Sequence, residues 1–203
     1  MKLDKLILAS SSPRRRELIK VFNIPFSVFD PEVDELLGEA EPEALIQLAI
    51  RKARTFHGEG VVMAADTAVV FENKLLGKPG NEEAAFEMLL ALRGRTHLVI
   101  TAVAAVLGDK VCSTYCSTLV SMRDYTEDEA WAYVASGSPM DKAGGYAIQD
   151  RDFSPVASYE GCYLNVVGLP LCTLVGVIRE LGFCIDNFNR PQECQGCQSE
   201  DLL

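Results

Sequence analysis

The sequence has few of the features that mark membrane, exported or triad-hydrolase proteins. Its longest apolar run, residues 98–107, is interrupted by Thr101 and is shorter than the ~20 residues of a membrane-spanning helix. The N-terminal run 6–9 is shorter than a secretory core of ~7–15 residues, so we expect a cytoplasmic protein. The only histidines, His57 and His97, are isolated, and without a GxSxG motif a Ser-His-Asp hydrolase has no support.

Positive charge is also scarce. The 203 residues include 19 Lys and Arg against 29 Asp and Glu, a net charge of −10. An acidic chain without a basic stripe binds duplex DNA and anionic membranes poorly, so we expect neither as a partner. Because exposed charges are screened beyond ~8–10 Å at cellular salt, a local group of Lys and Arg can still bind a small phosphate compound.

What the sequence does contain is an alternation of strand-like and helix-like segments. Expected strands cover residues 6–9, 26–29, 61–71, 96–107 and 110–122. Expected helices cover residues 14–22, 43–56, 82–92, 126–136 and 171–181. Gly108-Asp109 is a hairpin signal, which breaks a purely parallel sheet and predicts an α/β fold with a mixed sheet. We expect one domain, residues 1–185, followed by a polar, frayed C-terminal tail, residues 186–203.

Seven cysteines, an odd number, occur without a signal peptide, which predicts free thiols in a reducing compartment. They are Cys112, Cys116, Cys162, Cys172, Cys184, Cys194 and Cys197. The last two have the CxxC spacing of a zinc knuckle, but no second CxxC or histidine pair follows, and a structural zinc needs four ligands. Either the pair has a metal or redox role, or a polar tail happens to carry two thiols; the second interpretation is favoured.

The segment Ser10-Ser11-Ser12-Pro13-Arg14-Arg15 leads from a strand into a helix, with Ser12 as the predicted N-cap. The free backbone N–H groups and the helix dipole favour an anion there, and both arginines can bind phosphate oxygens bidentately. The alternative is a surface helix with solvated arginines. The segment is not a Walker A loop, because GxxxxGK[ST] is absent.

Asp66 is a carboxylate that, with Thr67, interrupts the apolar run 61–71. Burying an unpaired ion costs several kcal/mol. We therefore expect a partner cation, a metal or a catalytic role; the alternative is a strand break in which Asp66 caps a turn.

Two lysines extend this candidate site. Lys52 lies on the apolar face of a predicted helix, where a lysine usually snorkels to solvent, and Lys78 lies in a Gly-Lys-Pro turn, where it would ordinarily be an exposed loop residue. With Arg14 and Arg15 they provide four cations, close to the charge of a nucleoside triphosphate. These lysines therefore support a phosphate site only as members of that group.

Two further side chains suit a nucleotide site. A carboxylate from the acidic stretch, Asp34 or Glu35, together with Asp66 would suit a hard divalent cation that bridges phosphates. Gln149, at the end of a Gly-rich segment, can read a base edge through its amide donor and acceptor. The alternative for that segment is a tight glycine turn without a ligand.

Seven motifs in this order resemble the Maf family of nucleoside triphosphate pyrophosphatases. They are Leu8-Ala9-Ser10-x-Ser12-Pro13-Arg14-Arg15, Val33-Asp34-Glu35, Lys52-Ala53, Ala65-Asp66-Thr67, Gly77-Lys78-Pro79, Asp141-Lys142-Ala143-Gly144 and Val167-Gly168-Leu169-Pro170. The resemblance covers about residues 5–181. It implies a mixed, twisted sheet with flanking helices and two lobes around a cleft, and hydrolysis of a nucleoside triphosphate to the monophosphate and pyrophosphate with Mg²⁺ or Mn²⁺.

The resemblance also implies roles for individual residues. Asp66 matches the catalytic base, with Lys52 and Lys78 beside it, and Glu35 with Asp66 is the expected metal pair. The expected substrate-binding residues are Ser10, Ser12, Arg14, Arg15, Thr67 and Gln149. Arg14, Thr67 and Gln149 match the three positions that mark the dTTP/UTP branch, where the 7-methyl-GTP branch carries Trp, Gln and Glu. After Gln149, residues 150–155 depart from the family's Gly-rich pattern.

We therefore expect a metal-dependent pyrophosphatase acting on dTTP, UTP or modified pyrimidine nucleotides, with a link to the arrest of septum formation and cell division. Two alternatives stay open. One is the same chemistry on a modified purine nucleotide, and the other is a non-catalytic nucleotide-sensing regulator of cell division. The expected binding partner is the nucleoside triphosphate substrate. The sequence does not give the oligomeric state, so a homodimer stays open.

Overall fold

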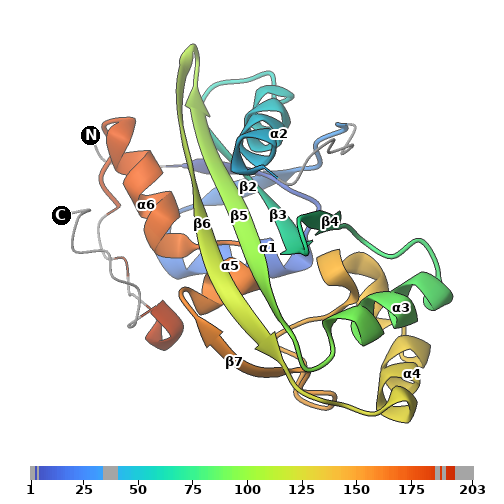
Figure 1. Cartoon of the computed structure of the whole chain (residues 1–203). Helices are drawn as coiled ribbons and strands as arrows, with labels where there is room; N and C mark the ends of the chain where they lie inside the picture. Colours follow the sequence, from blue (N-terminus) through green and yellow to red (C-terminus); the bar gives the residue numbers. More distant parts are fainter. Residues whose placement is uncertain (1–2, 4, 34–40, 186–187, 189–190, 195–203) are drawn as a thin grey trace.

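The computed structural model describes the chain except residues 1–2, 4, 34–40, 186–187, 189–190 and 195–203. A seven-stranded sheet lies at its centre, in the order β2-β1-β3-β5-β6-β7 with β4 paired to β3 (Figure 1). The strands are β1 (Leu6–Ala9), β2 (Phe26–Phe29), β3 (Val61–Phe71), β4 (Lys74–Leu76), β5 (Thr96–Leu107), β6 (Lys110–Met122) and β7 (Val156–Glu160). β1 runs parallel to β2 and β3, whereas the other pairs are antiparallel. The expected mixed α/β sheet is confirmed.

Helices cover both faces of this sheet. They are α1 (Pro13–Ile19), α2 (Pro42–Arg54), α3 (Glu82–Leu92), α4 (Glu127–Ala135), α5 (Tyr163–Val167) and α6 (Leu171–Glu180), with short 3-10 turns η1 (Lys20–Phe22), η2 (Ser138–Asp141), η3 (Ala143–Gly145) and η4 (Gln192–Cys194). α2 packs on one face through Leu45, Ala49 and Ala53. α1, α5 and α6 pack on the other face in the largest hydrophobic cluster.

Alternation along β3 decides which helices its side chains meet. Successive side chains of a strand point to opposite faces of the sheet. Ala64 and Ala68 belong to the clusters under α2, whereas Met63 and Ala65 belong to the cluster under α1, α5 and α6. The next polar residue on the α2 face is therefore Asp66, and Thr67 points to the opposite face.

The expected strand 61–71 is confirmed, and the alternative of a strand break at Asp66 is wrong. β3 is continuous, and Asp66 and Thr67 pair with Ala102 and Thr101 of β5. Ladder hydrogen bonds come from the backbone, so polar side chains do not break a strand when they find partners. Asp66 has such a partner in Lys52, so the alternative of a turn-capping Asp66 is also wrong.

The expected helix 14–22 is shorter than predicted. Its α-helical part ends at Ile19 and a 3-10 turn continues to Phe22. Ser12 does stand at the N-cap position, but its side chain makes no cap hydrogen bond. At the other end of the chain, Phe188 packs on Phe22 with ring centroids 5.2 Å apart, and Cys194 is fully buried. The described part of the tail is therefore not frayed, whereas the domain boundary at residue 185 stays a prediction.

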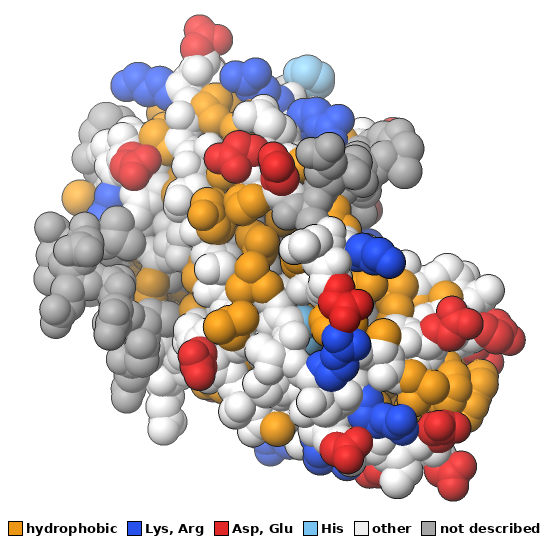
Figure 2. All heavy atoms as spheres, in the orientation of Figure 1, with side chains coloured by type: hydrophobic (Ala, Val, Ile, Leu, Met, Phe, Trp, Pro, Cys, Tyr) orange, Lys and Arg blue, Asp and Glu red, His pale blue; other side chains and the backbone are white. Residues whose placement is uncertain are grey.

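A second hydrophobic cluster lies under α3 and α4, at the end of the sheet away from β1. Figure 2 shows orange side chains gathered over this region with acidic side chains beside them. Phe86 and Trp131 stack there with centroids 4.3 Å apart, and Trp131 is 41% exposed. In the described part of the chain, no helix is long and apolar enough to cross a membrane.

His97 lies beside this second cluster and makes stability depend on pH. Its ring is buried, Nε2 lies 2.6 Å from the Tyr146 hydroxyl, and Nδ1 has no partner among the described residues. Burial lowers the pKa of His97 from 6.5 to about 4. Between these values the unfolded chain binds a proton that the folded chain excludes, so folding weakens as the pH falls.

We expect the free energy of unfolding to fall by about 3 kcal/mol between pH 6.5 and pH 4 on account of His97, at 1.36 kcal/mol for each pKa unit. Urea denaturation at pH 7 and pH 5 measures the loss. His97→Gln, which cannot titrate, should reduce the difference between the two pH values. The exposed His57 provides the control variant His57→Gln, and equal pH slopes in both variants would refute the assignment.

Candidate functional site

A pocket opens along one edge of β3, between the part of the strand that pairs with β1 and the part that pairs with β4. β1 pairs with β3 as far as Leu8 and Met63, and β4 begins to pair at Val69 and Leu76. Within the described strands, residues 64–68 have no strand partner on this edge. The chain that follows β1 lines the pocket there instead, so side chains from both faces of β3 reach one cavity.

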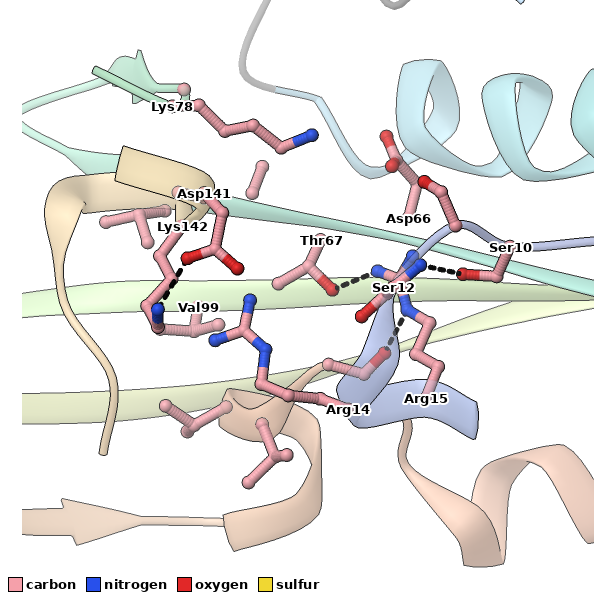
Figure 3. Close-up of a pocket in the computed structure, with 18 of the residues that line it drawn as sticks. Ser10, Ser12, Arg14, Arg15, Asp66, Thr67, Lys78, Val99, Asp141 and Lys142 are labelled. Atoms are coloured by element: carbon pink, nitrogen blue, oxygen red, sulfur yellow. Dashed lines mark hydrogen bonds and ion pairs between the residues drawn. The ribbon is translucent and has the colours of Figure 1, made fainter. Parts of the chain in front are cut away.

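The pocket has a volume of about 610 Å³, within the usual ~300–1,000 Å³ of small-molecule sites. The structure brings most of the predicted site residues to its wall (Figure 3). Those that line it are Ser10, Ser12, Arg14, Arg15, Lys52, Asp66, Thr67 and Lys78. Gln149 is exposed and is not among the lining residues. Glu35 and Asp34 lie outside the described residues.

Asp66 and Lys52 form a nearly buried ion pair at the wall of this pocket. Lys52 Nζ donates to Asp66 Oδ1 at 2.7 Å, and the two side chains are 6% and 13% exposed. Lys52 lies in the last turn of α2, on the stripe that packs against the sheet. The alternative of a lysine that snorkels into solvent is therefore wrong, because its ammonium group ends on a carboxylate of the sheet.

Arg15 reaches across the pocket from α1 and is held at two atoms. Its Nε donates to the Gly168 carbonyl at 2.7 Å, and its Nη2 donates to Thr67 Oγ1 at 2.9 Å. Gly168 has φ of +113°, and a Cβ there would lie 3.3 Å from Thr67 Oγ1. A larger residue would therefore strain the backbone and crowd the hydroxyl that positions the guanidinium group.

Behind Thr67 a chain of buried polar groups continues into the sheet. Thr67 and Thr101 hydroxyls lie 2.9 Å apart, and Thr101 Oγ1 donates to the Asn165 carbonyl at 2.9 Å. The Asn165 amide donates to the Val99 carbonyl and to Thr118 Oγ1, each at 2.9 Å. Thr101 and Asn165 are fully buried. Since Thr101 uses its own hydrogen on Asn165, Thr67 donates to Thr101 and accepts from Arg15.

Thr101→Val tests whether this chain of bonds positions Arg15. Valine keeps the shape but removes the acceptor of the Thr67 hydroxyl hydrogen and one of the two donors to the Asn165 carbonyl, which keeps its bond from Gly168 N–H. We expect a loss of about 1–3 kcal/mol in the free energy of unfolding and a higher KM for the nucleoside triphosphate that the family resemblance predicts as the substrate. Thr101→Ser should restore both values. Thr96→Val is the matched control on the same strand, because Thr96 is exposed. An unchanged KM in Thr101→Val would contradict the positioning role.

Arg14, Lys78, Asp141 and Lys142 form the rest of the polar wall. Figure 3 shows Lys78 and the Asp141–Lys142 pair on the wall opposite Ser10 and Arg15. Lys142 Nζ donates to Asp141 Oδ1. Burial acts to raise the pKa of Asp141, but the hydrogen bond and charge of Lys142 and the charge of Arg14 outweigh it, so this pKa lies below its usual value. Asp141 is therefore ionised at neutral pH.

Several residues of the pocket, and of the hydrogen-bonded chain behind Thr67, were not among the predicted site residues. Asp141 and Lys142 belong to a motif quoted for the family resemblance, but that motif carried no role for them. Thr101 was visible as the polar residue inside an apolar run, whereas Asn165 had no comparable signal. Tyr146 also lines the pocket and joins it to His97.

The pocket offers little ready-made metal coordination. Its described lining contains two carboxylates, Asp66 and Asp141. Nowhere in the described chain is a group of three or more His, Cys, Asp and Glu side chains arranged to hold a metal ion by itself. Mg²⁺ is usually bound by one or two carboxylates together with substrate phosphates. The metal role expected for Asp66 therefore stays a prediction, in which substrate phosphates would supply further ligands.

The chain is similar to known proteins over most of its length. The family model described as Maf-like protein matches residues 5–181. A dTTP/UTP pyrophosphatase of Thermomicrobium roseum is 46% identical over 201 residues, covering 95% of this chain and 92% of that protein. A dTTP/UTP pyrophosphatase of Dehalococcoides mccartyi is 44% identical over 207 residues, covering 97% and 92%. The solved Staphylococcus aureus Ham1 protein shares 16% identity and a TM-score of 0.43 over 59% of this chain and 72% of that chain, a likeness too weak to bear on function.

Proposed function

The chain belongs to the Maf-like protein family, and on that premise we propose that it hydrolyses dTTP and UTP, or modified pyrimidine nucleotides, to the monophosphate and pyrophosphate. One observation carries the proposal. Arg14, Arg15, Lys52 and Lys78 line the same pocket as the nearly buried carboxylate Asp66. That arrangement supports a site in which positive charge binds a triphosphate beside a reactive acid.

Asp66 is the proposed general base. Its carboxylate orients a water molecule and accepts its proton as the water oxygen attacks the α-phosphorus and the bond to the pyrophosphate oxygen breaks. A positioned base of this kind contributes typically ~10²–10⁴-fold to a rate. Lys52, at 2.7 Å, holds the carboxylate in place.

The remaining cations stabilise the leaving group. Negative charge builds up on pyrophosphate as the anhydride bond breaks, and fixed positive groups aimed at that charge lower the barrier. Arg15 is fixed in position for this role, because Gly168 and Thr67 hold its guanidinium group. Lys78 and Arg14 contact the same polyphosphate from the other walls in this proposal, and Ser10 and Ser12 donate from the loop after β1.

A divalent cation, Mg²⁺ or Mn²⁺, completes the proposed site. Asp66 would hold it together with the phosphates, and Glu35 is the second candidate ligand. When bound, such an ion neutralises phosphate charge and orients the polyphosphate.

The base preference is proposed for the same pocket. Arg14 and Thr67, two of the three residues that match the dTTP/UTP branch, line it. Thr67 acts through Arg15, to which it is hydrogen-bonded. Gln149 lies outside the lining, so its proposed contact with the base requires its segment to move towards the bound nucleotide.

Pyrophosphate release from a panel of canonical and modified triphosphates, with metal omitted and then restored, tests the proposal. We expect metal-dependent turnover of dTTP and UTP with a monophosphate as the second product. Turnover confined to a modified purine nucleotide would favour that alternative. Binding of nucleotide without any pyrophosphate would favour the sensing regulator. The link to cell division stays a prediction.

A further inference from the structure

The pocket has an apolar end as well as a charged one. Three buried members of the second hydrophobic cluster, Val69, Val99 and Tyr146, line it. The Tyr146 hydroxyl lies 2.6 Å from the buried His97 Nε2, which leaves the tyrosine ring to line the pocket. Figure 3 shows Asp66 on the far side of Thr67 from Val99. The apolar end is therefore separate from the place of the proposed chemistry.

Asp141 stands beside this apolar end on a fixed turn. Asp141 ends η2, and its chain neighbours Met140 and Ala143 pack against the second hydrophobic cluster. In η3, Gly144 N–H donates to the Gly77 carbonyl at 3.0 Å. Gly144 has φ of +71°, and a Cβ there would lie 3.0 Å from a methyl group of Val69. Only glycine therefore allows the turn to approach β3 this closely.

Lys142 fixes the direction of the Asp141 carboxylate. Lys142 Nζ donates to Asp141 Oδ1 and to the Ser138 carbonyl. The Lys142 side chain is 15% exposed and that of Asp141 is 63% exposed. Figure 3 shows the second carboxylate oxygen of Asp141 directed into the cavity. The pocket thus presents a charged hydrogen-bond acceptor beside its apolar end.

Such an acceptor suits only one part of a nucleoside triphosphate. Like charges repel, so a carboxylate beside the polyphosphate needs a cation between the two. In the proposed function that cation is the metal at Asp66, whereas Asp141 is already bonded to the ammonium group of Lys142. The base is the uncharged part of the substrate, and its apolar faces suit an apolar wall with few polar groups. A base at this end would present its edge to Asp141.

We infer that Asp141 reads the base, by accepting a hydrogen bond from the ring N3–H of uracil or thymine; this inference rests on the function proposed above. Once N1 carries the sugar, that N–H is the only donor of either base. Cytosine has an unprotonated N3, whose lone pair would face the carboxylate. Guanine also has a ring N–H on its pairing edge, so Asp141 separates uracil and thymine from cytosine and does not by itself exclude purines.

The N3-methyl analogue of UTP tests this contact, because methylation removes the hydrogen and leaves the triphosphate unchanged. For the unmodified protein we expect kcat/KM to be about 10–100-fold lower for N3-methyl-UTP than for UTP, the usual effect of losing a hydrogen bond to a charged group. In Asp141→Ala, kcat/KM for UTP should fall by a similar factor. The difference between UTP and N3-methyl-UTP should then disappear.

Asp141→Asn gives a second, opposite readout. Lys142 can donate to the amide oxygen as it does to Oδ1, which turns the amide nitrogen, a donor, towards the cavity. We expect kcat/KM to fall for UTP and dTTP and to rise for CTP, a reversal that Asp141→Ala should not give. Asp124→Asn is the matched control, because Asp124 is exposed and outside the pocket lining. It should leave the ratio of UTP to CTP turnover unchanged.

The results separate this inference from the proposed function. Equal kcat/KM for UTP and N3-methyl-UTP in the unmodified protein would overturn the reading of the base by Asp141. Equal losses for UTP, CTP and N3-methyl-UTP in both Asp141 variants would overturn it too, because a metal, phosphate or structural role affects every triphosphate alike. In both cases UTP turnover by the unmodified protein would still support the proposed function. An unmodified protein that hydrolyses neither UTP nor dTTP would overturn the proposed function and this inference with it.

Discussion

Asp66→Asn is expected to lower kcat for dTTP and UTP by about 10²–10⁴-fold, the usual contribution of a positioned general base. The amide keeps an oxygen that accepts the hydrogen bond from Lys52, which now spans 2.7 Å, but it cannot accept a proton from water. The chain should therefore keep its fold, at some cost in stability, and lose most turnover. Steady-state pyrophosphate release gives the rate, and circular dichroism gives the fold.

A matched control for this variant is Asp124→Asn, the same chemical change at an exposed residue paired with Arg93 at 3.9 Å. It should leave kcat and KM unchanged. Full activity in Asp66→Asn would remove Asp66 from the mechanism. A normal kcat with a strongly raised KM would also contradict the role of base, because it would assign Asp66 to binding of the substrate or its metal.

Local signals predicted the elements that are determined by neighbouring residues. The hairpin formed by β5 and β6 has the expected bounds. Gly108, with φ of +57°, adopts the turn conformation that the Gly-Asp pattern predicts. The capping box of Thr126 and Glu129 is present with both of its hydrogen bonds. Asn81 likewise caps α3 through its side chain. In each case the residues that decide the structure lie within a few positions of one another.

The elements that were missed depend on distant parts of the chain. β7 is an edge strand whose residues 157–160 are exposed, so its sequence lacks the alternation of apolar and polar residues that predicts a strand. Its pairing with β6 also includes an irregularity at Ser121 and Met122. α5 has five residues and ends at Gly168, too short for a helical period to appear. β7 is held by its pairing with β6, and α5 by contacts with β5 and β6, strands that lie far from both elements in the sequence.

The candidate site also has features that local sequence predicts and features that depend on distant parts of the chain. Asp66 and Lys52 could be predicted because each is a charge in an apolar setting, and such a charge needs a partner. That Lys52 and Asp66 pair with each other follows only from the packing of α2 on the face of β3 that carries Asp66.

Lys52→Met is expected to lower the free energy of unfolding by about 3–5 kcal/mol, the usual loss when one partner of a buried ion pair is removed. The Asp66 side chain is only 13% exposed, and it projects from the middle of a strand that cannot shift without breaking the β3–β5 ladder. Its carboxylate would therefore remain desolvated without its main counter-charge. Urea denaturation at pH 7 measures the loss. Arg54→Met, at an exposed position on the same helix, should change stability by no more than about 0.5 kcal/mol.

The double variant Lys52→Met with Asp66→Asn decides whether charge is the cause. If the cost of Lys52→Met comes from an unpaired carboxylate, removing that charge should recover part of the loss, and the double variant should be more stable than Lys52→Met alone. If the cost came from lost packing of the lysine stem, the two substitutions would add. Additive losses would therefore assign the cost to packing of the lysine stem, whereas a loss under about 1 kcal/mol in Lys52→Met would show that this pair behaves as a solvated surface pair rather than as a buried one.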